Sequence, residues 1–293
     1  MKQIITGLFS LLIFLLPNFS FAASPILVPA WQTNAVFEQA ESIAFDAKNK
    51  QLYVSNINGN PTDADANGYI SQLSLDGSIN ELHWLDGLNA PKGLTIVGNK
   101  LYIADINELV VVDIKNKKIT QRYSAPDAKF LNDVVADKKG NIYVSAFLTN
   151  TLYRLSGDKF ETWLQSDELE VPNGLLVEND QLLVASWGVM TDGFATDIAG
   201  HLKTINLATK DIKSLGDKTP AGNLDGLESD GKGHYFVTDW MTGKLLYISP
   251  TGISTTLIQL EQGSADHTVL LEQNLVIIPM MLTGKLIAFE IKK

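Results

Sequence analysis

One sequence pattern recurs six times along the 293-residue chain. In each copy a polar residue opens a short apolar segment, a turn follows, and a second segment rich in β-branched and aromatic residues comes next. The copy around Asp225 shows the pattern clearly. Residues Asp230 to Gly233 are typical of a turn, and Tyr235 to Thr238 have the composition of a strand. The chain is therefore expected to fold as repeated small antiparallel units.

We call the polar residue that opens each copy its anchor. The anchors are Glu41, Lys92, Asn132, Asn173, Asp225 and Asp266, and they follow one another at intervals of 40 to 52 residues. Six units of this size, each with room for three or four strands, predict an all-β, six-bladed β-propeller with four-stranded blades. The sixth copy lacks an outer strand, and the segment from Ile26 to Phe37 belongs to no copy. We expect this N-terminal strand to pair with the last blade and close the ring.

Residues 1–22 have the features of a secretory signal peptide. Lys2 supplies a basic start, Ile4 to Leu16 form an apolar run, and Ser20 to Ala22 form a cleavage site with small residues. A membrane anchor fits less well because the apolar run is too short to span a bilayer. We predict cleavage near Ala22, a location in the bacterial periplasm or outside the cell, and a single propeller domain over residues 23–293.

The composition narrows the classes of partner. The chain has no cysteine, so packing and sheet hydrogen bonds must stabilise it without disulfides. Its net charge is −10, and it has no basic run, which argues against nucleic acid or a membrane surface as partner. We expect a monomer that acts on a small-molecule substrate.

The anchors themselves predict a metal site. The start of each innermost strand crowds around the central channel of a propeller, so the six anchors are expected to form a small ring. Five of them carry a side-chain oxygen. Carboxylate and amide oxygens are the ligands of a hard divalent cation, Ca²⁺ above all. The alternative is that these side chains cap strand ends and hydrogen-bond to one another around water. Lys92 is the discordant member, and it could pair with Glu41 or Asp266 or point away.

Four of the repeats resemble motifs of the SMP-30/gluconolactonase/LRE-like family, whose relatives include diisopropylfluorophosphatases and paraoxonases. The matching residues are Glu41 in AESIAFD, Asn132 in FLNDVVAD, Asn173 in VPNGLLVE and Asp225 in NLDGLESD. The resemblance implies that these four residues hold a catalytic divalent metal, and that Asp225 acts as base or nucleophile. The arginine with which sugar lactonases of this family bind their substrates has no evident counterpart near Asn132.

Further residues are candidates for the substrate site. Trp187 and Trp240 end second strands on the anchor face, and with Asp266 they are expected to line the substrate pocket, although packing between blades would also explain the tryptophans. His267 is a candidate proton carrier. Two long loops, residues 58–68 and 188–200, are expected to overhang the same face, as functional loops or as tolerated insertions.

Two functions are compatible with these patterns. The first is an exported, Ca²⁺-dependent hydrolase of lactones or related esters. The second is a non-catalytic propeller that binds a ligand or a protein and uses the metal structurally. The chain has no motif of a serine hydrolase, a zincin or a nucleotide-binding protein.

Two weaker patterns complete the sequence evidence. Asp63, Asp65 and Asn67 match the first half of an EF-hand loop, but Ser74 replaces the closing glutamate, so an Asx-rich turn is the alternative to a second cation site. The remaining histidines are expected at the surface. They are His83, His201 and His234.

Overall fold

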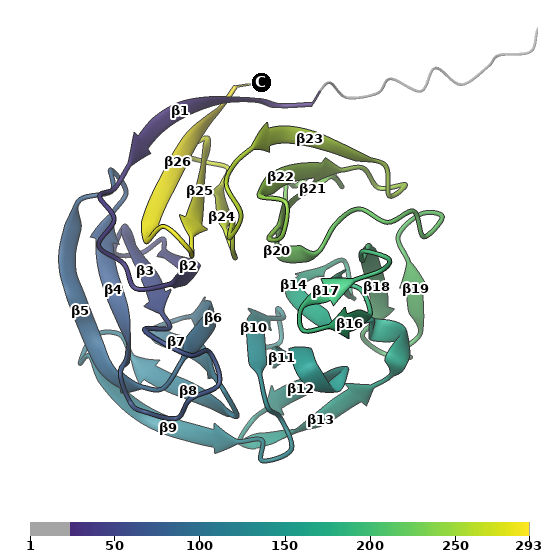
Figure 1. Ribbon diagram of the computed structural model, residues 1–293. Coiled ribbons are helices and arrows are strands. Elements are labelled where there is room, and N and C mark those ends of the chain that lie inside the picture. The colour runs from purple at the N-terminus through teal and green to yellow at the C-terminus, as the bar shows by residue number, and fades with distance from the viewer. Residues whose placement is uncertain (1–23, 293) are drawn as a thin grey trace, which may run out of the picture.

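The computed structural model describes residues 24–292, and the predicted signal peptide lies outside them. The described chain forms six four-stranded antiparallel sheets arranged in a ring around a central axis (Figure 1). The described residues contain no α-helix, and no helix that could span a membrane. The prediction of a six-bladed β-propeller is confirmed.

The strands of the first three blades follow one another from the centre of the ring outward. Blade 1 consists of β2 (Ala40–Asp46), β3 (Gln51–Asn56), β4 (Gly68–Ser74) and β5 (Ile79–Leu88). Blade 2 consists of β6 (Pro91–Val97), β7 (Lys100–Asp105), β8 (Glu108–Asp113) and β9 (Lys118–Ser124). Blade 3 consists of β10 (Leu131–Ala136), β11 (Ile142–Ala146), β12 (Thr151–Ser156) and β13 (Lys159–Gln165).

The other three blades follow the same order, with one interruption and one exchange. Blade 4 consists of β14 (Pro172–Glu178), β15 (Gln181–Ser186), β18 (Leu202–Asn206) and β19 (Ile212–Ser214), and its second loop carries a small hairpin of β16 (Met190–Asp192) and β17 (Ala195–Thr196). Blade 5 consists of β20 (Leu224–Ser229), β21 (Tyr235–Asp239), β22 (Lys244–Ile248) and β23 (Ser254–Gln259). Blade 6 contains β24 (Thr268–Leu270), β25 (Leu275–Met280) and β26 (Lys285–Lys292). Two single turns of 3₁₀ helix complete the fold, η1 (Phe147–Thr149) and η2 (Asp167–Leu169).

The N-terminal strand closes the ring, as predicted. β1 (Ile26–Gln32) pairs antiparallel with β26 and becomes the outer strand of blade 6, with Ile26 opposite Lys292. Without β1, the edge of β26 would present unpaired backbone groups to solvent. One blade is therefore built from segments at both ends of the described chain.

The hydrophobic core is divided into six clusters, one between each pair of neighbouring blades. The cluster between blades 1 and 2, for example, joins Tyr53 and Ile70 to Leu101 and Ile103. The two faces of every sheet are thus covered by the adjacent blades, so burial of alternate side chains on both faces follows from the ring. Two further clusters are smaller. One surrounds Ile57 and Ile106, and the other, around Phe147 and Trp187, lies at the face that carries the β16–β17 hairpin.

Candidate functional site

A β-bulge marks the anchor in each of the first five blades. In blade 1, Ala40 pairs with Asn56 and Ile43 with Val54, so two residues of the inner strand face one residue of the second strand. The same irregularity occurs at the corresponding place in β6, β10, β14 and β20. A bulge bends the strand and re-aims its side chains. The bulges therefore explain how five different strands direct their anchors toward one central space.

Hydroxyl groups on the second strands satisfy the backbone of three of these bulges. Ser55 Oγ accepts the N–H of Ser42 at 2.9 Å, and Ser145 Oγ accepts the N–H of Asp133 at 2.9 Å. Thr238 Oγ1 accepts the N–H of Gly226 at 2.8 Å. Since a bulge leaves a buried N–H without a ladder partner, these hydroxyls stabilise the shape that positions the anchors.

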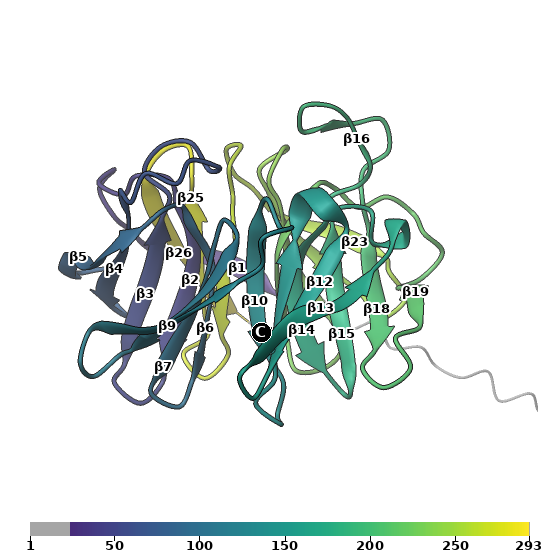
Figure 2. The same cartoon turned by 90° about the horizontal axis from the view of Figure 1, so that it is seen from below.

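The β16–β17 hairpin projects from one face of the ring (Figure 2). A pocket of about 230 Å³ lies over the anchors, and Phe194 of this hairpin is part of its lining. Its lining comprises Gln39, Glu41, Ile57, Pro61, Lys92, Phe130, Asn132, Phe147, Asn173, Trp187, Phe194, Asp225, Trp240, Met281 and Leu282. Five of the six anchors belong to this lining. Pro61 and Phe194 come from the two long loops, so both loops contribute to the pocket, as their position in the repeats predicts.

Four of the anchors form what we call the floor of the pocket: the carboxylates of Glu41 and Asp225 and the amides of Asn132 and Asn173. The Oε2 atom of Glu41 is buried and has no hydrogen-bond partner. Asn132 donates its side-chain N–H to Asn173 Oδ1, and Asn173 Nδ2 donates to the carbonyl oxygen of Leu224 at 3.1 Å. Burial, followed by repulsion from Asp225, raises the pKa of Glu41 well above its ordinary value. Burial and repulsion from a neighbouring carboxylate raise the pKa of Asp225 to about 8.

This floor fits a divalent cation. A buried carboxylate oxygen without a donor is costly, and a bound cation would remove that cost. Turning the amide of Asn132 would present its oxygen in place of its N–H, since the two ends of an amide have nearly the same shape. Within residues 24–292, no group of three Asp, Glu, His or Cys side chains has a metal-binding arrangement. The fit therefore depends on the two amides as well as on Glu41 and Asp225.

Neither Asp266 nor His267 belongs to the lining of the pocket. Asp266 Oδ2 accepts the hydroxyl of Ser42 at 2.5 Å, and burial raises its pKa well above the ordinary value. His267 is 1 % exposed, and neither ring nitrogen has a hydrogen-bond partner. Burial lowers the pKa of His267 to about 3, so the ring is neutral near pH 7. The predicted pocket role of Asp266 and the proton-carrier role of His267 stay predictions.

Lys92 neither pairs with a carboxylate nor points away from the channel. It is 1 % exposed, and its Nζ donates to the carbonyl oxygens of Pro61 and Ala90, both at 2.9 Å. The same Nζ lies 4.3 Å from the ring centroid of Phe130, a favourable cation–π distance. Burial lowers the pKa of Lys92 to about 8, although Glu41 opposes this shift. Lys92 thus connects the pocket to the loop of residues 58–68.

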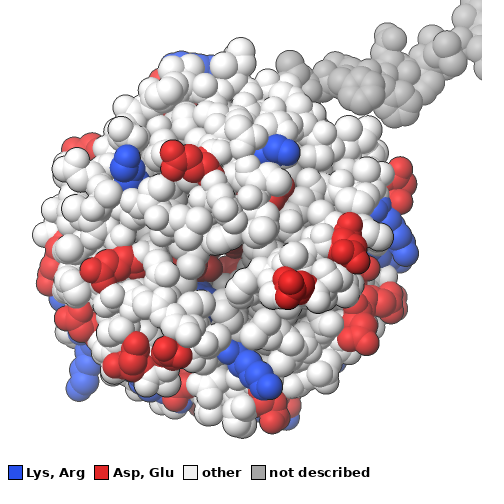
Figure 3. Space-filling view, in the orientation of Figure 1, with Lys and Arg blue, Asp and Glu red and all other residues white. Residues whose placement is uncertain are grey.

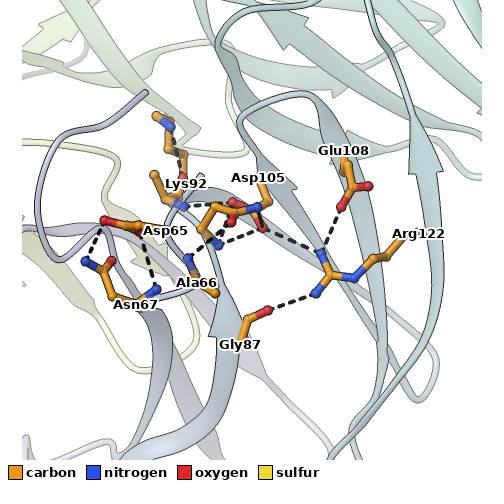
Figure 4. A network of polar contacts seen from close by, with 10 residues as sticks. Asp65, Ala66, Asn67, Gly87, Lys92, Asp105, Glu108 and Arg122 are labelled. Carbon is orange, nitrogen blue, oxygen red and sulfur yellow. Dashed lines mark hydrogen bonds and ion pairs between the residues drawn. The ribbon is translucent and has the colours of Figure 1, made fainter. Parts of the chain in front are cut away.

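A polar network extends from Lys92 toward the outside of blade 2 (Figure 4). Asp105 accepts the backbone N–H groups of Asn89 and Ala90, the latter at 2.8 Å. Arg122 Nη1 lies 3.8 Å from Asp105 and donates to Glu108 at 2.9 Å. Asp105 is completely buried, and this cluster of donors explains how its carboxylate is accommodated there. The network holds the backbone to which Lys92 donates.

Five aromatic side chains contribute to the pocket wall. Trp187 and Trp240 both line it, with ring centroids 6.1 Å apart. Phe147 meets Trp187 edge-on at 5.5 Å. Phe194 comes from the β16–β17 hairpin, and Trp187 Nε1 donates to its carbonyl oxygen at 2.9 Å. The hairpin is therefore fixed to the wall of the pocket by a side chain of the pocket itself.

Two of the weaker predictions concern residues away from the pocket. The backbone N–H of Asn67 donates to Asp65 Oδ1 at 3.4 Å, so residues 63–67 contain the hydrogen bond of an Asx turn. The prediction that all three remaining histidines are surface residues was wrong for His201. Its side chain is buried, and its Nε2 lies 2.8 Å from Ser214 Oγ, because β19 pairs beside it.

A model of the SMP-30/gluconolactonase/LRE-like region matches residues 39–266. The chain belongs to this family. Among solved structures, a gluconolactonase from Xanthomonas campestris superposes with a TM-score of 0.69 at 14 % sequence identity, over 92 % of this chain and 95 % of that one. At that identity the likeness shows the shared propeller fold. No curated protein sequence matches this chain.

The family match includes every floor residue. Glu41, Asn132, Asn173 and Asp225 all lie within residues 39–266, and the fold brings them together. Sequence reasoning did not identify Asp133, which follows an anchor and lies buried beside the floor. Apart from the anchor Asn132, the other residues of the segment FLNDVV are apolar, so the charge of Asp133 could have drawn attention to it.

Proposed function

We propose that this family member is an exported hydrolase of lactones or related esters that depends on Ca²⁺ or another divalent cation. The observation that carries the proposal is the orphaned Oε2 of Glu41, buried beside Asp225 at the bottom of an open pocket. Membership of the family and the likeness to a gluconolactonase support the reaction class. The sequence of residues 1–22 supports export.

The metal site would be formed by Glu41, Asn132, Asn173 and Asp225. A bound Ca²⁺ would polarise the carbonyl oxygen of the substrate and compensate the charge of the carboxylates. Four protein ligands leave positions for water and substrate in the six- to eight-oxygen shell that Ca²⁺ takes. The same side chains can hold the ion only if the amide of Asn132 presents its oxygen to the floor.

Asp225 is the residue we assign to proton transfer. It takes a proton from a water molecule while the water oxygen forms a bond to the carbonyl carbon. The bond between that carbon and the ester oxygen then breaks, and the departing oxygen receives the proton, which gives a hydroxy acid from a lactone. The aromatic wall excludes bulk water and orients the substrate above Asp225.

The test is hydrolysis of a panel of lactones and aryl esters by the purified protein, with Ca²⁺ and with a chelator. We expect activity that disappears with the chelator and in Asp225→Asn. The matched control is Asp76→Asn, an exposed aspartate in the turn between β4 and β5, which is expected to retain activity. Melting curves verify that both variants fold.

The outcome also decides between the enzyme and a binding scaffold. If Ca²⁺ raises the melting temperature of the wild-type protein but no substrate of the panel is hydrolysed, the scaffold with a structural metal is favoured. If Ca²⁺ changes neither property, the four floor residues are a hydrogen-bonded core and the metal site is wrong.

A further inference from the structure

The walls of the pocket are apolar. Nine of the fifteen side chains that line the pocket are hydrocarbon, aromatic or thioether in character. Four of the six polar ones form the floor. Only Gln39 and Lys92 are left as polar groups on the wall. A ligand that reaches the floor therefore passes almost entirely along apolar surface.

The polar atoms on the wall are already partly engaged. Gln39 Oε1 accepts the backbone N–H of Gly59 at 2.8 Å, and Trp187 Nε1 donates to Phe194. Lys92 uses two of its three N–H donors on the carbonyl oxygens of Pro61 and Ala90. A sugar lactone would bring several hydroxyl groups into this pocket. Hydroxyls that lose water without gaining partners weaken binding, and aromatic faces do not replace those partners.

The mouth of the pocket exposes apolar side chains. Phe194 is 48 % exposed and Leu282 is 55 % exposed, although both line the pocket. The ring of Phe194 packs against Phe147 at 6.1 Å and Trp187 at 6.3 Å, so it has a fixed position at the entrance. The surface around the central opening is largely uncharged on this face (Figure 3). Exposed apolar groups gathered at a pocket mouth indicate an apolar ligand.

We propose that the ligand of this pocket has an apolar body and a single acceptor group, so that the substrate is an alkyl- or aryl-substituted lactone or ester, not a polyhydroxylated sugar lactone. That the ligand is hydrolysed rests on the proposed function. That the pocket binds a ligand of this class does not. The apolar substituent packs between Trp187, Phe194 and Leu282. The remaining N–H of Lys92 donates to an oxygen of the ligand.

Lys92 is suited to that role because, among residues 24–292, it alone contributes a cationic side chain to the pocket lining. Its Nζ is held by two carbonyl oxygens and lies over the Phe130 ring, so a ligand oxygen meets a donor whose position is already fixed. Pre-positioned donors bind with a smaller loss of conformational freedom than flexible ones. The carboxylate of a hydroxy-acid product is a stronger acceptor for this ammonium group than a neutral carbonyl.

The first experiment compares three six-membered lactones: δ-valerolactone, δ-decalactone and glucono-δ-lactone. Each kcat/KM is divided by the uncatalysed rate constant, because the rings differ in reactivity. Each buried methylene contributes about a three- to fourfold gain, so we expect at least a tenfold preference for δ-decalactone over δ-valerolactone. Phe194→Ser is expected to reduce that preference at least threefold. Its control, Ile253→Ser, lies in the turn between β22 and β23 and should leave it unchanged.

The second experiment measures binding without turnover or metal. Trp187 and Trp240 line the pocket, so a ligand there changes tryptophan fluorescence. We expect 5-hydroxydecanoate to quench the fluorescence of chelator-treated protein and gluconate not to do so. Lys92→Met should raise the Kd for 5-hydroxydecanoate at least tenfold, whereas Lys117→Met, at a surface position, should leave this Kd unchanged.

The outcomes separate this inference from the proposed function. A preference for glucono-δ-lactone overturns the inference and leaves the lactonase intact. If no lactone or ester is hydrolysed, the proposed function fails, and the binding experiment alone decides the class of ligand. Quenching by 5-hydroxydecanoate then supports the inference. Quenching by gluconate, or by neither acid, contradicts it.

Discussion

Asp133 Oδ2 accepts the backbone N–H of Leu175 at 2.6 Å, and this hydrogen bond joins the innermost strands of blades 3 and 4. The other oxygen of Asp133 accepts the N–H of Val134 at 2.6 Å. Asp133→Ala would leave two buried N–H groups without partners, so we expect it to lower the free energy of unfolding by about 2–4 kcal/mol. Urea unfolding measures the change. Asp158→Ala, in the exposed turn between β12 and β13, is the control and should stay within about 0.5 kcal/mol of wild type.

Glu41→Gln is expected to separate metal binding from stability. Without metal, the substitution removes a carboxyl group whose ionised form is disfavoured by burial and by Asp225, so the unfolding free energy stays equal or rises by about 1 kcal/mol. With metal at a hundred times its Kd, the wild-type protein gains about 2.7 kcal/mol. The variant should lose most of that gain. Urea unfolding of the wild-type protein and the variant, each with Ca²⁺ and with chelator, gives the four unfolding free energies to be compared. An equal gain in both proteins would remove Glu41 from the metal site.

His267 is expected to make the fold sensitive to acid. Its pKa is about 3 in the folded protein and about 6.5 in an unfolded chain. Between these values the unfolded chain binds the extra proton, so the contribution of His267 to stability is complete above pH 6.5 and is lost as the pH falls toward 3. His267→Gln does not titrate in this range. The difference in unfolding free energy between wild type and variant should change by up to about 1.4 kcal/mol per pH unit.

The control for this prediction is His83→Gln, at an exposed position on β5. Buried carboxyl groups such as Asp133 also titrate in acid, but they are common to all three proteins and cancel in the differences. A difference between wild type and His267→Gln that stays constant from pH 7 to pH 4 would contradict the buried, unpartnered ring.

Gly174→Ala is expected to damage both the fold and the floor of the pocket. A Cβ atom at this position would lie 2.0 Å from the carbonyl oxygen of Asp225, so the backbone of blade 5 would have to move. We expect a loss of more than about 3 kcal/mol and a loss of the Ca²⁺-dependent rise in melting temperature. Gly231→Ala is the comparison. Its nearest contact would be at 3.5 Å, and its positive φ should cost only about 1 kcal/mol. Similar melting temperatures for the two variants would refute the prediction.

The sequence predicted the ring and much of its centre because both depend on repetition. The spacing of the anchors predicts the blades, and the position of each anchor within its blade places it at the axis. The strand from Ile26 predicts the closure, because the sixth repeat lacks a fourth strand. The loops at 58–68 and 188–200 follow from the same alignment. These features need only the order of segments along the chain.

The features that the sequence did not predict depend on pairing across strands. A regular strand points successive side chains to opposite faces, so Asn132 and Asp133 would be expected on different faces. The bulge changes that expectation, and a bulge depends on the register with the next strand. The partners of Lys92 are backbone carbonyl oxygens, which any residue type supplies. Burial of His201 likewise depends on the neighbouring strand that carries Ser214.

The pairing of β1 with β26 implies that the order of the blades along the chain could be changed by circular permutation. Ile26 and Lys292 are direct neighbours across that pair, so a short linker could join them. New N- and C-termini could then be introduced in a hairpin loop on the face opposite the pocket, so that the chain is not cut near a residue that lines the pocket. In the natural order, closure must bring together segments some 260 positions apart, so the transition state of folding depends on a long loop. A permuted chain would form blade 6 from adjacent segments, would move the long-range closure to the blade that carries the new termini, and should keep the same pocket.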